Sequence, residues 1–311
     1  MLKAKPIRVD VEASPIYELL LQMVVFSGFE NLETFDVGRD WAESRRQRCP
    51  AGLLQALDHL GGQFANLDQL MGIQAATPSP SIPAFLHRLE QLTPREIVLH
   101  LTGFYSELYP EDLESTIMAA VSGSRKARST AARALAGDMR ERHGAIARLL
   151  ATPAADLKEL VLAVIKGWYE SVFAADEGIA RSLLAADARA KHTLIGTNPE
   201  RLILIATGIK FGVKDRFRKV LLIPTLVMRP WVAVVNYKRL RIYGYPVAED
   251  PTSIETARRG LARTYHALGD EAGCRSIGAP IFVNLPRGDL AGPPECLAHR
   301  KRGLLAGSTT F

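Results

Sequence analysis

The stretch Lys219-Val-Leu-Leu-Ile-Pro-Thr-Leu-Val-Met228 marks the point where the chain changes from helical to extended periodicity. It is apolar and rich in β-branched residues, and the similar segments Trp231–Tyr237 and Leu240–Pro246 follow it. These segments predict three short strands in a small antiparallel meander. Pro224 and Pro246 have no amide hydrogen to give to a central ladder, so we expect them at edges or bulges.

The segments before this point have helical spacing. Ser14-Pro15 combines an N-cap residue with proline at the first helical position, which predicts a largely buried helix over Ile16–Ser27. One longer helix is predicted over Ser129–Ala151, and Thr152–Phe173 carries the clearest amphipathic stripe. The predicted fold class is therefore mainly α with a small antiparallel β meander, an α+β protein.

A second distinctive stretch lies beyond the strands, over Ile254-Glu-Thr-Ala-Arg-Arg-Gly-Leu-Ala-Arg-Thr-Tyr-His-Ala-Leu-Gly-Asp-Glu271. Its apolar residues recur at helical spacing and its arginines fall mostly on the other faces, so it predicts an amphipathic helix. Ser253 is a suitable N-cap and Gly269 a suitable stop.

Composition limits the function classes. The chain has 311 residues, 47% of them hydrophobic and 23% charged, which is typical of a soluble globular protein with room for two domains. Its net charge of +6 suits a partner that carries phosphates, although many soluble proteins without such a partner are equally basic.

Cysteine spacing and hydropathy indicate the compartment. Cys49, Cys274 and Cys296 lie far apart, so no disulfide framework is predicted and a reducing compartment is expected. The longest apolar run, Leu19–Phe26, is interrupted by Gln22 and is far shorter than the roughly 20 residues of a membrane span. We therefore expect a soluble cytoplasmic protein with no membrane partner.

Several segments, in this order along the chain, resemble the ArsR-type winged helix-turn-helix transcription regulators of bacteria. Ala13–Leu21 resembles the start of an N-terminal domain that precedes the winged helix in some members. Leu222–Pro224, Arg229-Pro230-Trp231 and Tyr245-Pro246 resemble a strand, a corner and a strand end of that domain. One further string resembles the end of the first helix in the winged-helix domain. It consists of Ala267, Leu268, Gly269, Asp270 and Glu271.

The resemblance covers roughly residues 13–271 and implies a DNA-binding transcriptional regulator. Residues 1–250 would form a helical effector or dimerisation domain with the meander at about 219–246, and residues 254–311 an incomplete winged-helix domain. The implied partners are DNA, a second copy in a homodimer and an unidentified small-molecule effector. The metal-sensing members carry a paired-cysteine string on a helix, which this sequence lacks, so metal sensing is not expected.

The segment after Glu271 departs from the family pattern. A winged helix requires a further helix pair and a β-wing, whereas residues 272–311 are rich in proline and glycine without apolar periodicity, so an irregular tail is expected. A shifted reading frame accounts for this, because Ala272-Gly-Cys274 can be encoded so that another frame gives the Arg-Leu pair expected there. We therefore expect this chain to be impaired in binding operator DNA.

Local motifs for catalysis or metal binding are missing from the sequence. It has no Gly-x-Ser-x-Gly elbow, Walker A string, dinucleotide glycine fingerprint, His-Glu-x-x-His pair or Cys-x-x-Cys pair. No enzyme activity, catalytic residue, metal site or cofactor is therefore predicted. Two alternatives stay open: a ligand-binding or protein-interaction module without DNA binding, and an enzyme whose site is assembled from distant residues.

Three basic features are candidates for anion contacts. Arg125-Lys-Ala-Arg128 and Lys214–Lys219 could approach phosphates, but solvated loops are the preferred interpretation. Arg229, fixed beside Pro230 and Trp231, could pair with a carboxylate or hold an anionic effector, and structural pairing is the preferred reading. Arg229 and Trp231 are thus the candidate effector or structural residues.

Overall fold

The computed structural model describes residues 7–62, 66–106, 109–196, 198–211, 217 and 219–247, giving the backbone alone for residues 29–31. Within these residues the chain is mostly helical with one small sheet, which confirms the α+β class. The predicted winged-helix residues 254–311 lie outside the described residues.

The helical elements occupy most of the chain before the last three strands. The α-helices are α1 (Pro15–Ser27), α2 (Gly38–Arg48), α3 (Ala51–Leu60), α4 (Met71–Ala76), α5 (Ile82–Gln91), α6 (Pro94–Leu101), α7 (Glu111–Val121), α8 (Arg125–Ala136), α9 (Arg140–Ala151), α10 (Ala154–Trp168), α11 (Glu177–His192) and α12 (Pro199–Thr207). Shorter turns are η1 (Phe29–Thr34), η3 (Leu67–Leu70), η4 (Phe104–Ser106) and the π-helical η5 (Tyr169–Phe173).

The sheet is mixed, and the predicted antiparallel meander is therefore wrong. Its strands are β1 (Arg8–Val11), β2 (Lys219–Thr225), β3 (Ala233–Tyr237) and β4 (Leu240–Pro246), in the order β1-β2-β4-β3. β1 and β4 lie parallel to β2 on its two sides, whereas β3 is antiparallel to β4.

The connections between the strands explain this order. β3 and β4 are joined by Lys238 and Arg239 alone, and so short a turn makes a hairpin, with Lys238 at a φ of 51°. The connection from β2 to β3 is longer, and it places β3 one strand position away from β2. β4 then lies between β2 and β3. Both β2 and β4 are buried along nearly their whole length, as is usual for parallel strands covered on both faces.

The prolines lie where the ladder tolerates them. β1 pairs with β2 only over Lys219–Leu222, and the carbonyl of Leu222 accepts from the Glu12 amide on that side. The backbone groups of alternate residues in a strand point toward the same neighbouring strand, so the nitrogen of Pro224 points toward the β1 side of β2. β1 has already ended at that level. Pro246 ends β4. Both prolines thus lie near the carboxyl ends of the inner strands β2 and β4, and not on edge strands as expected.

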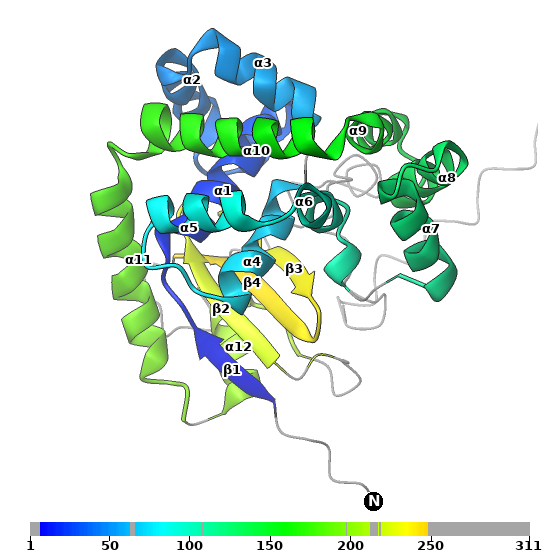
Figure 1. Cartoon of the computed structure of the whole chain (residues 1–311). Coiled ribbons are helices and arrows are strands. Elements are labelled where there is room, and N and C mark those ends of the chain that lie inside the picture. Colours follow the sequence, from blue (N-terminus) through cyan, green and yellow to red (C-terminus); the bar gives the residue numbers. More distant parts are fainter. Residues whose placement is uncertain are drawn as a thin grey trace, which may run out of the picture.

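Helix α1 lies at the centre of the molecule. Ser14 caps it, with Pro15 at the first helical position as predicted, and nearly all its residues through Phe26 are buried. It contacts β2, α4, α5 and α11, and Figure 1 shows α1, α5 and α10 stacked on one side of the sheet. The larger core joins these helices to one sheet face, so the strands pack against the N-terminal helices.

The opposite sheet face has a smaller core of its own. Val220, Leu222, Tyr243 and Tyr245 pack there with residues of α11, α12 and β1. The sheet therefore lies between two helical layers.

One predicted helix is divided in two. Instead of a single helix over Ser129–Ala151, α8 ends at Ala136, Gly137 follows with a φ of 59°, and α9 begins at Arg140. A positive φ is readily adopted only by glycine, so the chain can reverse there.

Candidate functional site

The carboxyl ends of the parallel strands β2 and β4 meet at one edge of the sheet. In open sheets of parallel strands, ligands commonly bind beyond this edge. Arg229 and Trp231 lie in the connection that leaves β2, and Val247 directly follows β4. Both predicted candidate residues therefore belong to this edge.

Arg229 is engaged by protein groups. Its Nη2 donates to the carbonyl of Val247 at 2.5 Å, and its Nε lies 3.9 Å from Oδ2 of Asp36. The Arg229 carbonyl accepts from the Asp36 amide at 2.8 Å. The side chain is 34% exposed and that of Asp36 44%, so this ion pair is solvated and contributes little stability by itself. The Arg229 guanidinium instead fixes the position of the chain where it leaves β4.

Trp231 fixes the same corner to the end of η1. Its indole is buried, and Nε1 donates to the carbonyl of Thr34 at 3.0 Å and to its Oγ1 at 3.3 Å. The ring lies tilted against Phe35, with centroids 6.3 Å apart. The corner at residues 229–231 is thereby docked on residues 34–36.

Glu18 of α1 lies fully buried where β2 ends. Its Oε2 accepts from the Thr225 hydroxyl at 2.7 Å and from the Leu226 amide at 2.9 Å, while Oε1 accepts from Gln22 at 3.3 Å. Burial raises the pKa of Glu18, and these hydrogen bonds together with Arg45 oppose that rise. The carboxyl group thus ties the central helix to the chain entering the corner.

Two arginines of α2 converge on the start of α11. Arg45 and Arg48 each donate to Oδ2 of Asp176, at 3.0 and 3.1 Å, and the Arg45 guanidinium lies 4.8 Å from the centroid of the Trp41 ring. Burial lowers the pKa of Arg45, which the Asp176 charge partly offsets. This cluster joins two helical segments that are far apart in the sequence.

A second group of titratable side chains lies near the carboxyl end of β3, at the sheet edge opposite to the carboxyl ends of β2 and β4. His100 is buried, and its ring stacks on Tyr237 with centroids 5.7 Å apart and tilts against Tyr105 at 4.6 Å. Burial lowers the pKa of His100 to about 4, and a hydrogen bond with the backbone of Gln69 opposes this shift. His100 is therefore neutral at physiological pH.

Asp68 adjoins this group. It is buried, accepts from Gln69 Nε2 at 3.0 Å, and has its pKa raised to about 6 by burial. Tyr109 and Arg142 both interact electrostatically with Asp68. Buried carboxylates with raised pKa values are a feature of many active sites, but Asp68 and Glu18 are both bonded to protein partners.

A buried ion pair lies between α11 and β4. Lys191 Nζ is 3.0 Å from both carboxylate oxygens of Asp187, and the Tyr245 hydroxyl donates to Oδ2 of Asp187 at 2.7 Å. The Lys191 ammonium also lies 4.5 Å from the centroid of the Tyr245 ring. The side chains of Lys191 and Asp187 are only 1% and 2% exposed, so the pair holds α11 to the sheet and offers no surface to a ligand.

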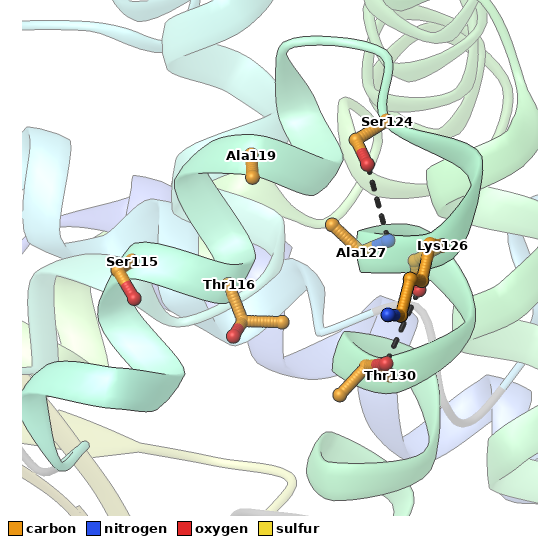
Figure 2. Close-up of a pocket in the computed structure, with 7 residues that line it drawn as sticks. All are labelled: Ser115, Thr116, Ala119, Ser124, Lys126, Ala127 and Thr130. Carbon is orange, nitrogen blue, oxygen red and sulfur yellow. Dashed lines mark hydrogen bonds between the residues drawn. The ribbon is translucent and has the colours of Figure 1, made fainter.

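A surface hollow of about 300 Å³ lies between α7 and α8. Figure 2 shows its small and hydroxyl-bearing side chains on facing helices, with Lys126 on the α8 side. The lining residues are Ser115, Thr116, Ala119, Ser124, Lys126, Ala127 and Thr130. No carboxylate lines this hollow, so a ligand bound there would not contact the buried acidic side chains.

The basic sequence clusters have different outcomes. Arg125-Lys-Ala-Arg128 forms the first turn of α8 and is not a loop, because Ser124 caps the helix by accepting from the Ala127 amide. Lys214–Lys219 lies mostly outside the described residues, as do Ala267, Leu268, Gly269, Asp270 and Glu271.

Sequence reasoning missed Glu18, His100 and the Asp187–Lys191 pair. Glu18 did leave a signal, since it is a carboxylate within a helix that is apolar on most faces. Asp187 and Lys191 are spaced i, i+4 in an alanine-rich helix, which usually indicates an exposed pair.

Metal sites, membrane-spanning helices and likeness to known proteins are the remaining features that bear on function. The described residues contain no group of three or more His, Cys, Asp or Glu side chains arranged for a metal ion. Among them, no helix is both long and apolar enough to cross a membrane. Comparison of the chain with protein-family models, curated proteins and solved structures found no match.

Proposed function

We propose that this chain is an ArsR-type transcription regulator in which the described residues form the effector and dimerisation domain. Support comes from the segments that carry the resemblance. Ala13–Leu21 lies at the start of α1, and α1 packs on β2, which contains Leu222–Pro224. Segments some 200 residues apart in the sequence therefore lie together.

The observation that carries the proposal is the hydrogen bond from Arg229 to the carbonyl of Val247. Val247 precedes by a few residues the segment that resembles the first winged-helix helix, at residues 254–271. The corner that holds Val247 is docked on residues 34–36 through Trp231 and approached by the Glu18 carboxyl group through Leu226. An effector that moved α1 or this corner would change how the C-terminal segment leaves the domain.

The proposal includes a cytoplasmic homodimer without enzyme activity, because helix-turn-helix regulators commonly bind paired half-sites. Light scattering of the purified chain tests the dimer. A mass equal to one chain at all accessible concentrations contradicts that part of the proposal.

DNA selection tests the regulator itself. The 311-residue chain and a protein that continues after Glu271 in the alternative reading frame are each incubated with a random duplex library at physiological salt. We expect the second protein to enrich one sequence motif and the 311-residue chain to enrich none, because base readout requires a recognition helix in the major groove. The proposal fails if the alternative frame encodes no helix pair, or if its product enriches no motif.

A further inference from the structure

Helices α7, α8 and α9 form a lobe, here called the α7–α9 lobe, over residues 111–151. α8 packs against both α7 and α9. Figure 1 shows the three helices gathered at one side of the molecule, away from the sheet. The lobe therefore presents surfaces that the two cores do not use.

Within this lobe, positive charge is concentrated in α8 and α9, whereas α7 carries three acidic residues and no basic one. From Arg125 to Arg148 there are seven basic residues and two acidic ones, an excess of five, while the whole chain has a net charge of +6. The basic residues are Arg125, Lys126, Arg128, Arg133, Arg140, Arg142 and Arg148, and the acidic ones are Asp138 and Glu141. Such a local excess over two short helices is the electrostatic footprint of a polyanion partner.

Four of the seven basic residues, Arg125, Lys126, Arg128 and Arg148, lie toward one end of the lobe. Arg125 and Lys126 are exposed in the first turn of α8, which contains no acidic residue. The positive end of the helix dipole adds to their charge. Because a three-residue turn joins α8 to α9, the two helices run in opposite directions and Arg148 lies alongside the first half of α8.

The acidic residues of the lobe lie at the other end. α7 begins with Glu111, Asp112 and Glu114, and it reaches the start of α8 only at its own last residue. The end of the lobe formed by the α7–α8 turn is therefore basic, and it is called the basic end below.

The hollow adjoining the basic end adds neutral hydrogen-bonding groups. Ser115 and Thr116 of α7 face Lys126 and Thr130 of α8 across it (Figure 2). Hydroxyl groups, arginine, lysine and helix N-termini are the groups that most often contact phosphate oxygens in complexes with DNA.

We propose that the basic end of the α7–α9 lobe binds the phosphate backbone of double-stranded DNA, independently of base sequence. Rigid helices hold the charges in place, as a regular row of phosphates requires. This contact is separate from residues 254–271 and does not depend on the family resemblance.

The character of the lobe surface distinguishes DNA from other anionic partners. The exposed large hydrophobic side chains of the described residues are Ile179 and Leu183, both on α11. The lobe thus lacks the aromatic or aliphatic anchors on which protein partners depend, and the large apolar face by which a helix enters a membrane surface. A polar, positively charged surface is the type that binds DNA.

The test uses the full chain and a short labelled duplex of arbitrary sequence, with binding measured by fluorescence anisotropy. The variant Arg125→Gln/Lys126→Gln removes two charges from the basic end. The control Lys166→Gln/Arg189→Gln removes two charges from exposed positions on α10 and α11. Far-UV circular dichroism verifies that each variant is folded.

Salt dependence gives the decisive measurement. Each lost phosphate contact should reduce the slope of log K against log salt by about 0.9, so the lobe variant should lose about 1.8 and bind on the order of 10- to 100-fold more weakly at about 50 mM salt. The control and the charge-conserving Arg125→Lys/Lys126→Arg variant should keep the original slope.

Three results would overturn the proposal: an unchanged slope in the lobe variant, an equal loss in the control, or an RNA duplex bound more than tenfold tighter than the DNA duplex. None of these outcomes depends on motif enrichment, which tests the regulator proposal, so the two can fail separately.

Discussion

Replacing His100 by phenylalanine should remove a loss of stability that the protein otherwise suffers in mild acid. His100 is buried against Tyr237 and Tyr105, and burial lowers its pKa from 6.5 to about 4. A base with a depressed pKa in the folded state stabilises the fold above its unfolded pKa. That contribution is lost as the pH falls from about 6.5 toward 4, because the unfolded chain takes up the proton first.

The magnitude follows from the two pKa values. Between pH 7 and pH 5, proton uptake by unfolded His100 lowers the free energy of unfolding by about 2 kcal/mol. His100→Phe retains a ring against Tyr237 but cannot take up a proton. It loses the hydrogen bond with Gln69, but that cost is the same at both pH values and cancels when each protein is compared with itself.

Urea unfolding followed by circular dichroism at pH 7 and pH 5 measures the effect. The change in unfolding free energy between the two pH values should be about 2 kcal/mol less unfavourable in His100→Phe than in the original protein. His87→Phe is the matched control, since the side chain of His87 is 70% exposed. If folded His100→Phe loses as much stability on acidification as the original protein, the reasoning from burial is refuted.

Two further substitutions test packing and charge. Gly72→Ala should destabilise the protein by about 2 kcal/mol or more, because its Cβ would lie 2.3 Å from Cδ2 of Tyr237, and Tyr237→Leu should restore part of the loss; an unchanged urea midpoint would show that the ring moves aside freely. Lys191→Met should cost about 3 to 5 kcal/mol at pH 7 by leaving Asp187 buried without its cation, and the double variant with Asp187→Leu should lose less. Equal losses in the single and double variants would show that burial of the lone carboxylate is not the cause.

Features set by neighbouring residues could be predicted from the sequence. The cap Ser14-Pro15 starts α1 as expected, and Asn198-Pro199 starts α12 in the same way, because a cap is made by a side chain and an amide a few residues away. Trp168 could be assigned to the core from its position on an amphipathic stripe.

Features set by distant residues could not be predicted. Strand periodicity gives no information about which strands are neighbours, so the parallel pairing of β2 with β1 and β4 was missed. Two of the three hydrogen-bond donors to Glu18, Thr225 and Leu226, lie more than 200 residues later in the sequence. Arg229 contacts Asp36 and Val247. Asp36 is remote in the sequence, and Val247 contributes only its backbone carbonyl, which no sequence pattern reveals.

The parallel pairing of β1 with β2 has a consequence for synthesis of the chain. β1 occupies residues 8–11 and its partner begins at residue 219, with α1 to α12 between them. At translation rates of about 5 to 20 residues per second, β1 waits on the order of 10 to 40 s for the strand that completes it. Helix α1 waits equally long for Thr225 and Leu226, which donate to Oε2 of its buried Glu18. During that time the apolar residues of α1 and the Glu18 carboxyl group lack the β2 residues that cover them in the finished fold.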